Sequence, residues 1–155
     1  MLDISKNWNS IIIIDSNKKE ICFDIEKKKV NVDDFSVDFP GEYEKSGILA
    51  EVKEFSGTLF YSFTIDSKHL FIVTTDKLEI KEDILSFFWD IDVLIILWTK
   101  DAVKVFENLE AKLVIPYGET KEIFLNSLGQ HIESVESYRV KWDLDWEKSE
   151  FVNLG

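Results

Sequence analysis

The chain has 155 residues, 45% of them hydrophobic and 31% charged, which is typical of a single globular domain with its own core. Acidic residues outnumber basic ones by 30 to 18, the formal net charge is −12, and Arg139 is the only arginine. Nucleic acids and anionic membranes are bound chiefly through cationic side chains, so we expect neither as a partner. The one basic run, Lys27–Lys29, adjoins acidic residues and is typical of a solvated hairpin turn.

The sequence also indicates a cytoplasmic protein. No apolar run approaches the length needed to cross a bilayer, and the first ten residues, MLDISKNWNS, lack the pattern of a signal peptide. The single cysteine, Cys22, has no partner in the chain, so a disulfide scaffold is excluded and a reducing compartment is expected. Cys22 stands between Ile21 and Phe23, where a thiol usually behaves as a small buried apolar group.

The first half of the chain predicts antiparallel strands. One hairpin is expected from Ser10–Asp15 with Glu20–Asp24, and another from Gly47–Phe55 with Thr58–Ile65, because each pair of β-rich runs is separated by a short polar turn. His69–Thr75 follows, and its continuous apolar centre is typical of a buried strand.

The second half alternates between helical and strand patterns. In Leu78–Trp89, apolar residues recur at helical spacing behind an acidic first turn, which predicts a helix. The elements expected next are a strand over Asp92–Trp98, a helix over Lys100–Leu109 with Thr99 as its N-cap, a strand over Lys112–Ile115 stopped by Pro116, and a helix over Glu119–Leu128 with Gly129 as its C-cap.

The tail returns to the alternation of a half-buried strand. From Tyr138 to Trp146, aromatic and aliphatic residues alternate with charged ones, so an aromatic inner face is predicted. Antiparallel strands followed by alternating helices and strands indicate an α/β (α+β) fold. We expect one layered domain over residues 1–155, with mixed sheets covered by about three helices.

Four segments, in order along the chain, are similar to motifs of one family. Phe39–Glu44, continuing to Gly47-Ile48, is similar to a "PGEYE…GI" motif carried here by Pro40, Gly41, Glu42, Tyr43 and Glu44. The other segments are Asp90–Leu97, similar to a "DVLLIP" strand, Leu109–Pro116, similar to "LEPKIVIP", and Phe124–Gly129, similar to the helix end "FLKELG". The set resembles a bacterial branch of the metallo-β-lactamase superfamily, the predicted zinc-dependent hydrolases, from about Phe35 to the C-terminus. It implies a metallo-β-lactamase-like sandwich, shortened near its N-terminus.

The motif residues also have a purely structural interpretation. Pro40-Gly41 favours a type II turn, because proline fixes one φ angle and glycine supplies a positive one. Glu42, Tyr43 and Glu44 are more typical of the start of a strand than of catalytic groups.

The resemblance implies a zinc site whose residues this sequence lacks. Active relatives carry a His-x-His-x-Asp-His loop before the PGEYE strand, but Val30–Phe39 contains no histidine. Where the family has a Gly-Asp turn, this chain has Thr75-Asp76, and Tyr117 follows Pro116 where the family often has histidine. We therefore expect a degenerate relative without a metal motif.

Ligand stoichiometry supports the same expectation. A hydrolytic zinc needs about three protein ligands, and His69 and His131 are the only histidines. We expect no cofactor and no metal, and only Asp76 and Glu119 remain as weak carboxylate candidates for a harder ion. Asp143, Asp145 and Glu147, and the pair Asp33-Asp34, are weaker still, since solvated strands and turns produce such spacings.

Other catalytic schemes find little support. Cys22 with His69 or His131 forms a nucleophile–base pair only in principle, and no Ser elbow, P-loop or dinucleotide-binding glycine motif is present.

We therefore expect a non-catalytic domain that acts by protein binding or self-assembly. Its candidate interface residues are Trp89, Trp98, Trp142 and Trp146, since aromatics are enriched in interfaces, although core packing also explains a tryptophan. Sheet surface exposed by the shortening favours a homo-oligomer.

Two alternatives remain open. The first is a residual metal-dependent hydrolase that uses carboxylates such as Asp76 and Glu119. The second is an acidic mimic of nucleic acid that binds a basic partner.

Overall fold

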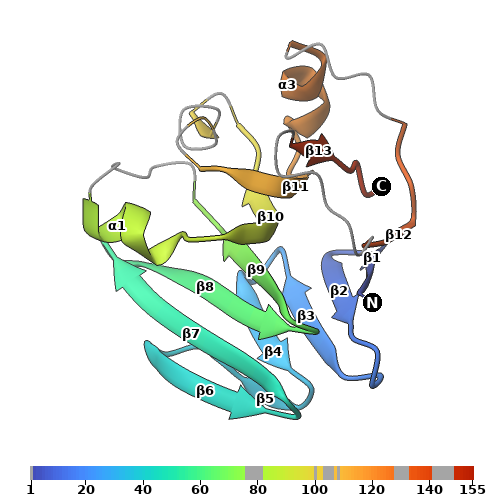
Figure 1. The fold of residues 1–155 in the computed structure, drawn as a ribbon. Coiled ribbons are helices and arrows are strands. Elements are labelled where there is room, and N and C mark those ends of the chain that lie inside the picture. Colours follow the sequence, from blue (N-terminus) through green and yellow to red (C-terminus); the bar gives the residue numbers. More distant parts are fainter. Residues whose placement is uncertain are drawn as a thin grey trace.

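The computed structural model describes residues 2–75, 82–99, 101–102, 107, 109–127, 133–140 and 149–155. Two β-sheets face each other, and helices lie outside them (Figure 1). No helix within these ranges is both long enough and apolar enough to cross a membrane.

The first sheet has six strands in the order β12-β1-β2-β3-β4-β5, with antiparallel neighbours throughout. Its strands are β1 (Asp3–Asn7), β2 (Ser10–Ile14), β3 (Glu20–Asp24), β4 (Lys29–Val32), β5 (Phe35–Ser36) and β12 (Ser137–Arg139). The first predicted hairpin is confirmed as β2–β3, and the basic run lies in and beside the exposed β3–β4 turn. Strand β1 was not predicted from the sequence; it pairs with β12, so residues 3–5 lie beside residues 137–139.

The second sheet has seven strands in the order β13-β11-β10-β9-β8-β7-β6. They are β6 (Gly41–Lys45), β7 (Ile48–Phe55), β8 (Thr58–Ile65), β9 (Lys68–Val73), β10 (Ile91–Leu97), β11 (Ala111–Tyr117) and β13 (Glu150–Phe151). From β6 to β9 the neighbours are antiparallel, so the second predicted hairpin is confirmed as β7–β8. From β9 to β13 they are parallel, so the sheet is mixed.

The main core lies between the two sheets. Because side chains alternate between the two faces of a strand, Ile21 and Phe23 of β3 both point into this core and are fully buried. Cys22, between them, points the opposite way and is only half-buried. The expectation of a buried thiol was therefore wrong, because the period of two places it on the outer face of the first sheet.

A second core lies on the outer face of the second sheet. Helix α1 (Glu82–Phe87) packs there: its last residue, Phe87, and the next residue, Phe88, lie against Phe60 and Phe71, with centroid distances of 5.4 to 6.0 Å for three of the ring pairs. This helix confirms the described part of the helix predicted over Leu78–Trp89, whose residues 78–81 lie outside the described ranges.

Helix α3 (Lys121–Ser127) confirms the last predicted helix, although Gly129 lies outside the described residues. The described residues contain two helices, α1 and α3, against the expected three. The helix expected over Lys100–Leu109 falls mostly on residues outside them, but Thr99 Oγ1 accepts a hydrogen bond from the Ala102 N–H at 3.3 Å, as an N-cap does.

Pro116 does not stop its strand as predicted, since β11 runs on to Tyr117. The Trp98 N–H bonds to the Tyr117 carbonyl and the Val152 N–H to that of Val114. Residue 116 therefore directs its backbone groups towards the side of β13. Among the described residues, β13 pairs with Leu113 and Val114 and not with Pro116, so the missing N–H of proline breaks no ladder bond there.

In the tail, Tyr138 is half-buried, Arg139 is exposed and Val140 is buried, which agrees with the predicted alternation. The remainder of that predicted strand, from residue 141 to Trp146, lies outside the described residues.

Candidate functional site

Strands β9, β10 and β11 run parallel, so their carboxyl ends meet at one edge of the second sheet and their amino ends at the opposite edge. Ligands of such sheets usually bind beyond the carboxyl ends. The zinc positions implied by the resemblance, after β9 and after Pro116, belong to this carboxyl edge. Both of these edges of the second sheet carry polar side chains, but the chemical groups at the two edges differ.

At the carboxyl edge, Tyr117 fills the space between the two sheets. Its side chain is buried, its ring meets Phe23 edge-on at 5.3 Å, and its hydroxyl donates to the Val73 carbonyl at 3.3 Å. Burial raises the pKa of the Tyr117 phenol, so the group stays neutral. At the end of β10, Trp98 is likewise fully buried and packs against Phe151 at 5.8 Å.

The hollow left at this edge has a volume of about 280 Å³. Its lining includes the exposed Lys28 and the hydroxyl residues Thr58, Thr74 and Thr75. These groups supply an ammonium and hydroxyls, with no imidazole, thiolate or carboxylate among the described lining residues.

The described residues of the carboxyl edge therefore do not fit zinc. Zinc is bound by imidazole, thiolate or carboxylate groups, whereas Tyr117 is a buried neutral phenol and Lys28 a cation. Within the described ranges, no three His, Cys, Asp or Glu side chains lie close enough together to hold a metal ion. Of the two carboxylate candidates, Glu119 is exposed just after β11, and Asp76 lies outside the described residues.

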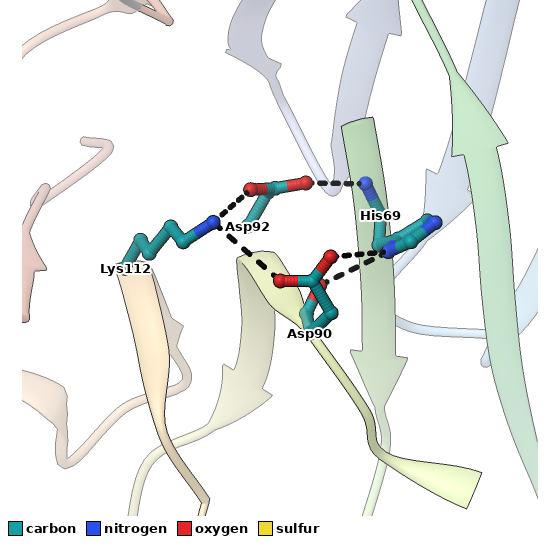
Figure 2. Close-up of polar contacts among 4 residues, drawn as sticks. All are labelled: His69, Asp90, Asp92 and Lys112. Carbon is teal, nitrogen blue, oxygen red and sulfur yellow. Dashed lines mark hydrogen bonds and ion pairs between the residues drawn. The ribbon is translucent and has the colours of Figure 1, made fainter. Parts of the chain in front are cut away.

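The amino edge carries a cluster of four charged or titratable side chains, from the starts of β9, β10 and β11 (Figure 2). Asp92 is almost completely buried. Its carboxylate accepts from Lys112 Nζ at 2.9 Å and from the His69 backbone N–H at 2.8 Å. The hydrogen bond to Asp92 raises the pKa of Lys112, and Asp90, at 3.6 Å, adds to the shift.

His69 is oriented by the backbone. Its Nδ1 lies 3.1 Å from the Asp90 carbonyl oxygen, which only accepts, so Nδ1 carries the proton and Nε2 holds the lone pair in the neutral ring. The Asp90 carboxylate is 3.6 Å from the same nitrogen, and Trp89 lies against the ring at 4.5 Å. Asp90 itself adopts a φ of 47°, which turns the chain between Trp89 and β10.

Two hollows flank this cluster. Asp90 and Lys112 line one of about 420 Å³, together with Leu85, Phe88 and Leu109. His69 and Trp89 line the other, of about 230 Å³, which lies over strands β6 to β9.

The four candidate tryptophans have different fates. Trp89 is 59% exposed and remains available to a partner. Trp98 is completely buried, so its place among the interface candidates was wrong: it belongs to the second core, where its ring meets Phe151 of β13. Trp142 and Trp146 lie outside the described residues, as does His131.

The PGEYE segment is structural where it is described. The Tyr43 hydroxyl donates to the Phe39 carbonyl at 2.6 Å, and Glu44 Oε1 accepts from the Gly47 N–H in the β6–β7 turn at 3.0 Å. The φ of Gly41 is 153°, not the angle of about 80° that a type II turn requires. The turn prediction for Pro40-Gly41 was therefore wrong, whereas the predicted strand start is confirmed as β6.

The cluster at the amino edge was not predicted from the sequence. Its signal was the pair Asp90 and Asp92 on either side of Ile91, at the start of an apolar strand. The partners Lys112 and His69 stand 20 and 23 residues from Asp92 in the sequence, so no local pattern joins them.

No protein-family model and no curated protein matches this sequence. A crystal structure from Thermotoga maritima, described as that of a candidate Zn-dependent hydrolase of the metallo-β-lactamase superfamily, matches with a TM-score of 0.73 and 16% identity. The match covers 99% of each chain. The chain therefore shares the fold of that protein over its whole length.

Proposed function

We propose that this chain is a degenerate metallo-β-lactamase-like domain that acts in the cytoplasm by binding another protein, without zinc hydrolysis. The observation that carries the proposal is the position of Tyr117. Its buried, neutral ring stands directly after Pro116, where the resemblance places a histidine, and it bonds to the end of β9. A side chain that fills the space between the sheets leaves little room there for a hydrolytic centre.

The opposite edge supports a binding role. Trp89 is 59% exposed and Leu49 53%, and both line the hollow of about 230 Å³ over β6 to β9. Large aromatic side chains that remain in water on a concave surface are typical of protein interfaces. The proposal includes either a different protein or a second copy of this chain as the partner.

Metal analysis of the purified protein tests the catalytic half of the proposal. We expect well under one zinc, manganese or magnesium ion per chain, and no metal-dependent hydrolysis of ester or phosphodiester substrates. Stoichiometric metal that is lost together with hydrolysis in the Asp76→Ala or Glu119→Ala variant would establish the residual hydrolase instead. Asp15→Ala, at a carboxylate in the β2–β3 turn, serves as the control.

Mass spectrometry of co-purified proteins, combined with light scattering, tests the binding half. A stable partner or a homo-oligomer is expected. A monomer that captures nothing specific at native concentration would contradict the proposal.

A further inference from the structure

We propose that an open part of the second sheet, the glutamate face, binds lysine or arginine side chains of a basic partner protein. The glutamate face consists of Glu42, Leu49, Glu51, Ser62, Thr64, His69 and Trp89, all of which line one hollow. This inference rests on the proposed binding function, because it names the surface and the chemistry of the partner.

Strand register builds the face in two rows. Glu42, Glu51 and Ser62 are successive cross-strand partners from β6 to β8, and Leu49, Thr64 and His69 are successive partners from β7 to β9. Because partners point to the same side of a sheet, each row lies on the outer surface. Helix α1 packs over the other end of this surface, on Phe60 and Phe71, so the two rows stay open.

The pairing of Glu42 with Glu51 is unfavourable in the free protein. Like charges directly opposite each other destabilise a sheet, and Glu42 is exposed beside the half-buried Glu51. Lys53 Nζ lies 3.3 Å from Glu51, but among the described residues no ion pair reaches Glu42. A cation bound between the two carboxylates would relieve this repulsion. Departures from favourable local pairing are expected at binding sites.

The far side of the hollow is aromatic and apolar. The Trp89 ring lies 4.5 Å from the His69 ring. Thr64 stands between His69 and the exposed Leu49 in the same row of cross-strand partners. A lysine or arginine can lay its methylene stem on Leu49 and Trp89, where the indole face also attracts the cation. Its charged end then reaches the carboxylates, with the hydroxyls of Ser62 and Thr64 beneath.

The charge of the face decides between partners. Two copies that met through this surface would bring Glu42 and Glu51 against the same residues of the other copy, and each chain carries a net charge of −12. Nucleic acid and anionic lipid are repelled for the same reason. A basic segment of another protein is complementary in charge and in shape.

Titration of the ¹⁵N-labelled protein with a capped synthetic peptide of alternating lysine and glycine tests the inference. The Trp89 indole N–H and the Thr64 and Leu49 amides should shift, whereas the exposed Trp8 indole should not. A peptide of alternating glutamate and glycine should leave the spectrum unchanged.

The decisive variant is Glu42→Gln with Glu51→Gln. We expect peptide affinity to fall about five- to tenfold, because two carboxylates contact the cation, while the Tm of the free protein rises by about 1–2 °C. Trp89→Ala should weaken binding about threefold. A merely misfolded variant would lose stability, so the rise in Tm separates a lost binding site from a lost fold.

Matched controls remove the same charge or the same ring elsewhere. Glu122→Gln with Glu136→Gln neutralises two exposed carboxylates on α3 and before β12, and Trp8→Ala removes an indole from the β1–β2 turn. Both should change affinity less than twofold. Equal weakening by the control pair, or a Trp89 signal that never moves, would overturn the inference in favour of diffuse attraction to the net charge.

The outcomes also separate this inference from the function on which it rests. A protein that keeps a specific partner after both glutamates are replaced binds through another surface, so the inference fails and the binding function stands. A protein with stoichiometric metal and hydrolysis refutes the proposed function, whatever the peptide does.

Discussion

The side chain of Asp92 shows how one residue holds the amino ends of three parallel strands together. A carboxylate with 9% of its side chain exposed is stable only if its oxygens are bonded. Lys112 of β11 satisfies one oxygen and the backbone of His69 in β9 the other. These bonds therefore fix the relative position of β9, β10 and β11. They also fix His69, which lines the hollow beside Trp89.

Lys112→Met should destabilise the domain by about 2 kcal/mol, because it leaves the Asp92 carboxylate without its counter-ion. The lysine side chain is a quarter exposed, so this loss is smaller than that for a fully buried ion pair. Chemical denaturation measures it. Adding Asp92→Asn should recover part of the loss. Lys45→Met, which breaks an exposed pair with Asp34 at 3.5 Å, should cost less than about 0.5 kcal/mol.

The pH dependence of the same pair follows from the sign of its pKa shift. The folded-state pKa of Lys112 lies above the ordinary value of 10.5, chiefly through the hydrogen bond to Asp92. Its stabilisation is therefore complete below pH 10.5 and is lost as the pH rises through the folded-state value. The difference between wild type and Lys112→Met should stay constant near neutrality and shrink in alkali. A difference that vanishes near pH 7 would refute this account.

Between elements, one hydrogen bond joins the two sheets at their β5 and β6 ends. Ser46 in the β6–β7 turn donates to Asp33 Oδ2 at 2.5 Å, and Asp33 Oδ1 accepts from the Glu20 N–H at 3.1 Å. These bonds, that from Ser46 foremost, lower the pKa of Asp33. From the sequence, Asp33 was only a weak metal candidate, whereas in the structure its carboxylate connects two turns.

Ser46→Ala should cost about 1 kcal/mol near neutral pH, since one hydrogen bond to a carboxylate is removed. The lowered pKa of Asp33 means that its contribution is present above about pH 3.8 and is lost as the pH falls through the folded-state value. Thermal unfolding at pH 7 and pH 3 measures the change. Ser36→Ala, which loses a local bond to Asp38 on an exposed strand end, should have a smaller effect at both values.

For the whole molecule, an excess of twelve negative charges opposes compaction. Added salt screens this repulsion at surface distances. The Tm in calorimetry should therefore rise when sodium chloride is increased from low to physiological concentration. A Tm that falls would mean that favourable ion pairs such as Arg139–Asp3, at 2.8 Å, outweigh the net repulsion.

The sequence by itself determined both hairpins and most of the longer strands, because the alternation of a half-buried strand and the apolar run of a buried one are local patterns. It did not indicate β1, and the sandwich was implied only by the family resemblance. It also determined the lack of histidine ligands, since composition limits any zinc site. The prediction that Pro116 stops its strand was wrong. Whether β11 needs an N–H at that residue depends on how far β13 pairs along it, which is a tertiary contact.

Only the tertiary structure decided which polar residues meet. His69, Asp92 and Lys112 come from three strands, and Glu42 faces Glu51 only because β6 and β7 pair in this register. It also decided that Trp98 is buried while Trp89 stays in water, although both stand at the ends of elements in the sequence. Contacts between distant segments depend on the packing of whole sheets, and no local pattern of residues encodes that packing.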